Sequence, residues 1–306
     1  MSSPTILWSI FGVAVIAMLF IDFKLFSGKG KSVGIKEALI WSGVWVGVAL
    51  LFNAGIMFFD KERAVNFLTG YLIERALSMD NIFVFILIFN FFRVPAMNQQ
   101  GVLFWGILLA LVLRVVFIGA GVVLINAFHW TIYLLGAMLL FVGIKMLFTK
   151  DEEKDLSESK ILKFIKKLYP VTSEYHGKKF FINKDGVRWA TPLFVVFVMV
   201  AAMDVVFAVD SIPAILAVTT DPFVVYTSNI FAILGLRALY SAIAALTGMF
   251  HYLNVGLCAI LVMIGLKMLA TDLVHIPVVW TLVLVALILL LSVVVSILFP
   301  KKEVLA

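Results

Sequence analysis

Cysteine is almost absent from this sequence, since Cys258 is the only one in 306 residues. A single cysteine excludes a disulfide framework within the chain and a metal cluster held by several thiolates. Charged residues are scarce as well, at 14% of the chain, where soluble domains carry about a quarter. Hydrophobic residues make up 63%, and water would leave much of that apolar surface uncovered. The composition therefore predicts a protein embedded in lipid.

The motifs of membrane-embedded enzymes are also missing. The sequence contains no HExxH pattern of a metalloprotease and no Ser/His pair on plausible helices. Its intramembrane aspartates lack the glycine-flanked motif of aspartyl proteases. We therefore expect that the protein is not an enzyme.

Long apolar runs are present at about nine places, each near the roughly 20 residues that a helix needs to cross the hydrocarbon of a bilayer. The first run is too long for a signal-peptide core and has no basic leader, so we expect it to be retained. The predicted fold class is all-α, a polytopic membrane protein. The predicted spans are Ile6 to Phe26, Glu37 to Phe59, Ala64 to Phe92, Gln100 to Ile125, Trp130 to Phe148, Ala190 to Thr219, Phe223 to Thr247, Tyr252 to Ala270 and Pro277 to Phe299.

Lysine and arginine gather in alternate loops, which orients the chain by the positive-inside rule. The basic loops are Lys24 to Lys36, the loop at Arg93, Lys150 to Arg188, and the tail with Lys301 and Lys302. We expect these loops in the cytoplasm, with the N-terminus outside and the C-terminus inside, in the cytoplasmic (inner) membrane. The net charge of +6 is then an orientation signal, and the expected partner is membrane lipid and not nucleic acid. The oligomeric state is not predicted.

The basic segment from Lys150 to Trp189 is the one substantial soluble part of the chain. Its first half contains an amphipathic stretch, in which Ile161, Leu162, Ile165 and Leu168 share a face suited to the membrane surface. In its second half, Lys184-Asp185-Gly186 is a turn signal between two short apolar strands and predicts a small hairpin. The alternative is a solvated linker without a function.

Two parts of the sequence resemble each other, which predicts an internal repeat. Acids six positions apart occur in Glu74 to Phe83 and again in Asp204 to Pro213, and Arg114 matches Arg237. Each repeat contains three spans, and because three is an odd number the second repeat enters the membrane from the opposite side. Such inverted repeats are typical of alternating-access transporters. The clearest match, at a constant offset of 122 positions, pairs Phe128-His129-Trp130 and Gly143 to Leu147 with Phe250-His251-Tyr252 and Gly265 to Leu269.

The repeat divides the chain into five parts. We predict two N-terminal transmembrane helices (1–62), a first three-helix repeat (63–149) and the cytoplasmic loop (150–189). A second three-helix repeat (190–271) and a C-terminal helix with a basic tail (272–306) complete the chain.

Four acids, Glu74, Asp80, Asp204 and Asp210, fall near the middle of the first helix of each repeat. An ionised carboxylate there costs at least ~3 kcal/mol on insertion scales, which is a high cost for a purely structural role. Both helices are long enough that they must tilt, kink or break, and Pro213 predicts a break that frees the carbonyl of Val209. The predicted ligands of a hard divalent cation such as Mg²⁺, Ca²⁺ or Mn²⁺ are Glu74, Asp80, Asn81, Asp204, Asp210 and Ser211.

Accessory roles are predicted for residues near these ligands. Ser78 shares the helical face of Glu74, and Met79 would suit Mn²⁺ as a softer ligand. The arginines Arg114 and Arg237 are expected as counter-ions that occupy the acids when no cation is bound. Neighbouring carboxylates that take up a proton as the cation leaves would give proton antiport. The accessory set is Ser78, Met79, Asn53, Arg114, Arg237 and Val209.

Plainer roles compete with these predictions. The four acids could be neutralised by the arginines alone, Arg75 included, without any metal. Asn53 is more often a contact between helices than a ligand. Asp22 stands beside Lys24 at the cytoplasmic interface, where an ion pair is the default expectation.

The paired segments Glu74 to Phe85 and Asp204 to Ala214 resemble the two hallmark segments of the TerC family, named for tellurium resistance. The resemblance extends over nearly the whole chain, including Ile21-Asp22, Leu51-Phe52-Asn53 and Ala190 to Leu193. It implies a manganese exporter of the Alx-like branch, with Mn²⁺ as transported substrate and no permanently bound cofactor. Other roles linked to the family are Ca²⁺ exchange, tellurium resistance, metal loading of exported proteins and membrane-protein insertion. A membrane scaffold or insertion factor therefore stays open as an alternative to a transporter.

Overall fold

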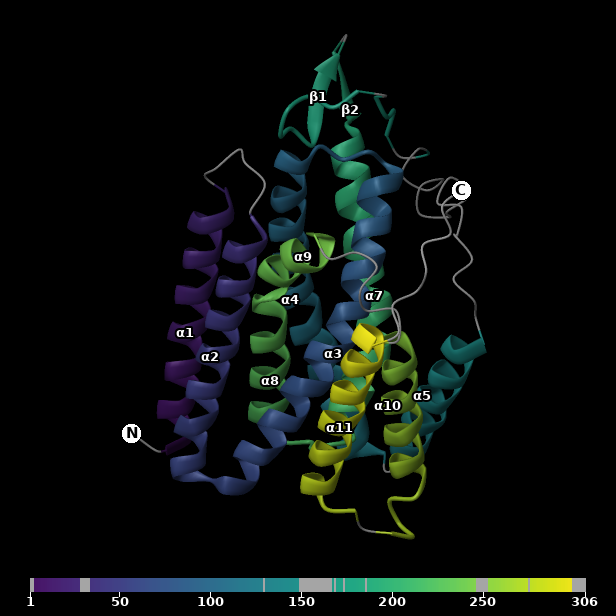
Figure 1. Cartoon of the computed structure of the whole chain (residues 1–306). Helices are drawn as coiled ribbons and strands as arrows, with labels where there is room; N and C mark the ends of the chain where they lie inside the picture. Colours follow the sequence, from purple (N-terminus) through teal and green to yellow (C-terminus); the bar gives the residue numbers. More distant parts are fainter. Residues whose placement is uncertain are drawn as a thin grey trace.

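The computed structural model describes residues 3–27, 34–128, 130–148, 167, 169–172, 174–184, 186–245, 253–274 and 276–298. Within these ranges the side chains of residues 3, 4, 26, 27, 80, 83, 146, 209, 210, 245, 253 and 254 are outside the description. The chain forms a bundle of long helices with a small β-hairpin at one end (Figure 1). The amphipathic stretch predicted at Ile161 to Leu168 lies outside the described residues.

The helices follow the predicted spans closely. Each predicted span corresponds to one described helix, except Phe223 to Thr247, which is divided into two helices. The helices are α1 (Ser3–Ser27), α2 (Ile35–Phe59), α3 (Lys61–Phe91), α4 (Ala96–Ala127), α5 (Thr131–Phe148), α7 (Pro192–Leu216), α8 (Pro222–Leu234), α9 (Leu236–Ala245), α10 (Leu253–Leu269) and α11 (Val278–Leu298).

The outer surface of the bundle is apolar, as a lipid-facing surface must be. Large hydrophobic side chains are exposed on several helices, for example Ile16 at 70%, Leu51 at 74% and Phe141 at 65%. In the described part, five helices are long and apolar enough to cross a membrane, or six if the bent pair α8 and α9 is one span. The all-α polytopic membrane fold is thus confirmed, and the count of nine spans stays a prediction.

The helix break expected at Pro213 is not where the structure bends. Helix α7 continues through Pro213 to Leu216, although a proline inside a helix lacks the N–H that would bond to the carbonyl four residues earlier. The bend of 41° lies instead between α8 and α9, at Gly235. A Cβ atom on Gly235 would lie 2.6 Å from Nη1 of Arg75. Arg75 donates a hydrogen bond of 3.0 Å to the carbonyl of Ala232, which satisfies backbone at the end of α8.

The two predicted repeats pack against each other reciprocally. Helix α3 contacts α8, α7 contacts α4, and α3 and α7 also contact each other. Helix α3 begins at the end of the bundle opposite the hairpin, whereas α7 begins at the hairpin (Figure 1), so the first helices of the two repeats run in opposite directions. This is the packing that a two-fold relation between inverted repeats would produce.

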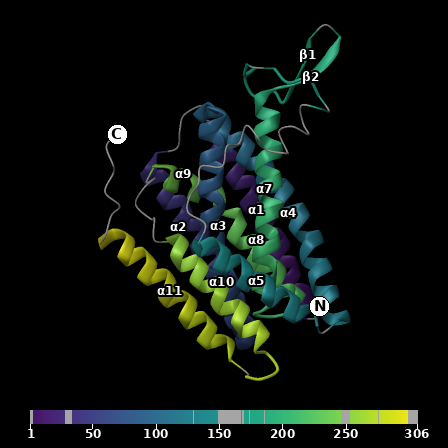
Figure 2. The same ribbon diagram turned by 90° about the vertical axis from the view of Figure 1, so that its right-hand side faces the viewer.

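The remaining helices cover this centre from two sides. Helices α1 and α2 lie on one side, in contact with α8 and α9, and α11 lies on the other, against α10 and α3 (Figure 1). Helices α5 and α10 run side by side in both views (Figure 2). Trp8 of α1 packs edge-on against Phe223 of α8, with ring centroids 5.1 Å apart.

The predicted hairpin is present at the end of the bundle. Strands β1 (Phe181–Lys184) and β2 (Val187–Ala190) pair antiparallel, with Lys184 opposite Val187. Gly186 in the turn has a φ of +73°, a conformation that glycine adopts without a steric cost. The segment before the hairpin is anchored by Tyr175, whose hydroxyl donates a 2.7 Å hydrogen bond to the carbonyl of Phe92. Burial raises the pKa of Tyr175 to about 12, so this donor keeps its proton at neutral pH.

Candidate functional site: a buried arginine between two carboxylates

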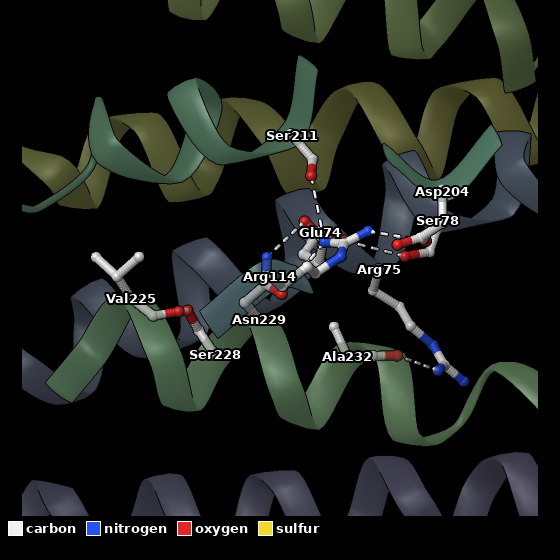
Figure 3. A network of polar contacts seen from close by, with 10 residues as sticks. All are labelled: Glu74, Arg75, Ser78, Arg114, Asp204, Ser211, Val225, Ser228, Asn229 and Ala232. Carbon is white, nitrogen blue, oxygen red and sulfur yellow. Dashed lines mark hydrogen bonds and ion pairs between the residues drawn. The ribbon is translucent and has the colours of Figure 1, made fainter. Parts of the chain in front are cut away.

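The central polar group of the bundle is built around Glu74 of α3. Its Oε1 atom accepts a hydrogen bond from Nη1 of Arg114, a residue of α4, and both side chains are fully buried. Ser78, one turn further along α3, donates to the same oxygen at 3.3 Å. Asn229 of α8 donates through Nδ2 to the other oxygen, Oε2, at 3.1 Å. Glu74 therefore has three partners from three helices (Figure 3).

Asp204 of α7 approaches the same arginine from another side. Its Oδ1 atom lies 3.5 Å from Nη2 of Arg114, and its side chain is 5% exposed. Ser211, also on α7, accepts a hydrogen bond of 3.3 Å from Nη1 of Arg114. The prediction that Asp204 and Ser211 share one face of their helix is therefore confirmed, as both face Arg114 (Figure 3).

The first two helices of each predicted repeat thus meet at one guanidinium. Glu74 and Asp204, which occupy matching positions in the two repeats, converge there and are not scattered. Two carboxylates and one guanidinium give this group a formal charge of −1. Because the group is buried inside a membrane bundle, that charge favours a further cation or proton nearby.

The hydrogen bonds of Arg114 are concentrated on one nitrogen of its guanidinium. Its Nη1 atom alone serves Glu74, Ser211 and the Oδ1 atom of Asn229, the last at 3.2 Å. Its Nε and Nη2 atoms make no hydrogen bond with any described residue, and neither does Oδ2 of Asp204. A guanidinium binds a carboxylate best through two parallel hydrogen bonds. Here neither acid is bound in that way.

The other two arginines of the bundle interior bind elsewhere. Arg75 points away from Glu74 and bonds to Ala232 and to the hydroxyl of Ser42, the latter at 3.1 Å (Figure 3). Arg237 forms an ion pair of 2.7 Å with Asp22 of α1, and its guanidinium lies 5.3 Å from the ring centre of Phe104. Among the acids whose side chains are described, Arg237 pairs with Asp22 and not with Glu74 or Asp204, because α1 supplies Asp22 as a closer partner. A counter-ion role of Arg237 toward Asp80 or Asp210 stays a prediction.

Asp22 is correspondingly not an interfacial partner of Lys24. Its side chain is buried at 4% exposure, whereas the ammonium of Lys24 lies 4.5 Å from the ring centre of Phe20. Asp22 and Lys24 are two positions apart on a helix, so their side chains point in different directions. The ion pair predicted for Asp22 exists, but it connects α1 to α9.

A known family matches most of this chain. The model of the family described as "Integral membrane protein TerC family" matches residues 59–304. The chain belongs to the TerC family.

Several bacterial proteins resemble this TerC protein along nearly their whole length. A Myxococcus xanthus protein, "Uncharacterized membrane protein STKORF319", is 48% identical over 272 residues, or 89% of this chain and 85% of that protein. An Escherichia coli K12 protein, "Putative membrane-bound redox modulator Alx", is 44% identical over 283 residues, or 89% of this chain and 88% of that protein. A protein of the same name from Photorhabdus laumondii is 42% identical and covers 97% of this chain and 96% of its own. No solved structure matches.

Some predicted ligands of the TerC protein cannot be placed. Asp80 and Asp210 belong to α3 and α7, but their side chains lie outside the described residues, as does that of Val209. Asn81 is buried at 3% exposure. Among the described residues, no three His, Cys, Asp or Glu side chains come together. A complete set of metal ligands therefore stays a prediction.

Two accessory predictions gain no support from the geometry. Met79 packs against the apolar core, since it lies on another face of α3 than Glu74. Asn53 is buried in α2, and its Oδ1 atom has no hydrogen-bond partner in the described part of the chain. A pocket of about 180 Å³ lined in part by Arg63 and Asp221 also lies apart from this group, roughly 16 Å along α3 from Glu74 by helical rise.

Asn229 was missed by the sequence-based prediction. It is fully buried and contacts both Glu74 and Arg114. The signal was a run of three polar residues, Thr227, Ser228 and Asn229, inside an otherwise apolar span. Consecutive polar residues in a membrane helix commonly face other helices, so this run predicts a polar contact between α8 and its neighbours.

Proposed function

We propose that this TerC protein exports a divalent cation, Mn²⁺ in the first place, across the cytoplasmic membrane by alternating access. The observation that carries the proposal is the convergence of Glu74 and Asp204 on one buried point between the two predicted repeats. In transporters built from inverted repeats, the substrate site lies at such a point.

The chemistry of the surrounding atoms supports a hard cation. The charged groups that face Arg114 are the carboxylates of Glu74 and Asp204. Oxygen ligands of this kind suit Mn²⁺, Mg²⁺ and Ca²⁺. Asp80 and Asp210 each follow the first acid of their helix by six positions, or about 9 Å along an ideal helix, and they are the residues we propose to complete the site.

Proton antiport is part of the proposal. Carboxylates that lose a divalent ion in a membrane interior need another source of positive charge. A proton on Asp80 or Asp210 would supply it, since Arg114 already serves Glu74 and Asp204. Transport should then be stimulated by an inward proton gradient.

Competing functions have less support. A scaffold or insertion factor would need no buried acids shared between helices. The Escherichia coli relative is named as a redox modulator, but this sequence has only one cysteine and so no dithiol pair of its own. Tellurite is an anion, and a group of formal charge −1 would repel it.

The test is uptake of Mn²⁺, Ca²⁺ and Mg²⁺ into proteoliposomes that contain wild-type protein, Glu74→Gln or Asp204→Asn. We expect both variants to slow Mn²⁺ transport at least roughly 10-fold, as loss of a group in a metal site usually does. Asp204→Asn is the sharper of the two, because Asp204 makes a single long contact to Arg114 and its loss disturbs little else.

A matched control is Glu62→Gln, which removes an exposed carboxylate from the first turn of the same helix α3. It should transport Mn²⁺ at the wild-type rate. Equal uptake by wild type and Asp204→Asn would remove the proposed mechanism. Uptake of Ca²⁺ but not of Mn²⁺ would show that the substrate is Ca²⁺ and would leave the proposed site unchanged.

A further inference from the structure

The position of Arg114 raises the question of how a metal ion could enter this site at all. A guanidinium repels a divalent cation, and Arg114 occupies the space between Glu74 and Asp204. We propose that Arg114 is the resident cation of the site, which a divalent metal ion displaces on binding and which returns when the ion leaves. This inference rests on the proposed function, because it concerns the same two acids.

The hydrogen-bond geometry favours an exchangeable arginine over a fixed structural one. Glu74 and Asp204 are each contacted through a single oxygen, without the paired hydrogen bonds that make an arginine–carboxylate contact strong and specific. Three of the polar atoms here, Nε and Nη2 of Arg114 and Oδ2 of Asp204, are buried with no hydrogen bond to a described residue. Buried groups in a structural ion pair are normally satisfied. The unused oxygen of Asp204 is available to a metal ion.

Neutral acceptors next to Arg114 give the guanidinium a place to go. Nη1 already lies 3.3 Å from Oγ of Ser211 and 3.2 Å from Oδ1 of Asn229. A small movement could keep these two contacts while it releases both carboxylates. The arginine would thus stay hydrogen-bonded when its charge partners bind the metal.

The other interior arginines do not compete for this role. Arg75 is held by the Ala232 carbonyl and by Ser42, and Arg237 is held by Asp22. Arg114 is therefore the arginine whose loss should change metal binding, and Arg75 offers a matched control. Arg75 is likewise buried, at 7% exposure, and sits one position after Glu74.

The experiment uses wild type, Arg114→Gln and Arg75→Gln. Titration calorimetry in detergent measures the Kd of each for Mn²⁺, and transport rates are measured in proteoliposomes. Removal of a competing cation should lower the Kd of Arg114→Gln about 10-fold and slow its turnover, since nothing then helps the ion to leave. Arg75→Gln should keep the wild-type Kd. A Kd of Arg114→Gln that is unchanged or higher would overturn the inference, because an arginine that merely organises the two acids would weaken binding when removed.

A second measurement uses wild-type protein and does not depend on the folding of a variant. The infrared difference spectrum on addition of Mn²⁺ is recorded for protein with ordinary arginine and with ¹⁵N-labelled arginine. A label-sensitive guanidinium band that changes with Mn²⁺ is expected, and its absence overturns displacement even if Arg114→Gln binds more tightly. Wild-type protein that binds no Mn²⁺, Ca²⁺ or Mg²⁺ would instead reject the proposed function itself.

Discussion

At the scale of single residues, Asn229 is the neutral group that connects the two charges of the site. Its amide nitrogen donates to Glu74 and its amide oxygen accepts from Arg114. An asparagine satisfies both kinds of partner at once, which neither an acid nor a base can do. It fixes the carboxylate and the guanidinium relative to each other without adding charge.

Replacement of Asn229 by leucine should destabilise the protein. Asn229→Leu leaves Oε2 of Glu74 buried without the 3.1 Å hydrogen bond that it accepts. An unsatisfied buried acceptor of this kind costs about 1–3 kcal/mol. We expect a lower free energy of unfolding in an SDS titration of detergent-solubilised protein. Asn90→Leu, at an exposed position of α3, is the control and should change little. Equal stability of both variants would show that Asn229 does not hold the site together.

The acids of the site could be predicted from the sequence, and their partners could not. Glu74 and Asp204 stand out because a carboxylate is expensive in a membrane helix and because the two positions match between the repeats. Which arginine they meet depends on packing between helices far apart in the sequence. Arg114 and Arg237 look equivalent in the repeat, but Asp22 on α1, outside both repeats, binds Arg237.

At the scale of helices, α5 and α10 approach each other more closely than larger residues would allow. An added Cβ on Gly265 would lie 2.8 Å from the carbonyl oxygen of Gly136 and 2.8 Å from the backbone nitrogen of Leu140. Backbone atoms cannot move aside as a flexible side chain can. Small residues at helix contacts are a common way to pack helices in membranes.

Gly265→Ala should therefore destabilise the pair of helices. Overpacking typically costs about 1–3 kcal/mol. Because the clash is with backbone atoms, we expect a cost above the lower end of this range, and so above the gain of about 1 kcal/mol from replacing glycine by alanine in a helix. Gly47→Ala in α2 is the matched control, because nothing lies within 4 Å of its added Cβ, and it should be neutral or stabilising. In detergent, Gly265→Ala should therefore lower the thermal midpoint, and Gly47→Ala should leave it unchanged or raise it. An unchanged or raised midpoint of Gly265→Ala would mean that α5 and α10 are not in close contact.

Helix positions were predictable from apolar length, and helix bends were not. The spans of α1, α2 and α5 follow from the need to cross the hydrocarbon, and the hairpin follows from the turn signal at Gly186. The bend at Gly235 has no strong local signal, because it accommodates Arg75 from another helix. Pro213 has a strong local signal, yet α7 continues past it to Leu216.

At the scale of the whole molecule, the two ends of the bundle differ. The hairpin lies at one end, and the connection between α10 and α11 lies at the opposite end (Figure 1). If the bundle spans the membrane, these two segments face opposite compartments. The positive-inside rule predicts that the hairpin, which belongs to the basic segment Lys150 to Trp189, faces the cytoplasm.

Cysteine labelling tests this orientation. In a Cys258→Ser background, Asn183→Cys places a thiol on an exposed position of β1, and Leu273→Cys places one at a position that is 85% exposed. A membrane-impermeant maleimide added to intact spheroplasts should label Leu273→Cys and spare Asn183→Cys, which should react only after permeabilisation. The reverse pattern would invert the orientation and with it the direction of export. Labelling of both positions in intact spheroplasts would contradict a bundle whose two ends lie on opposite sides of the membrane.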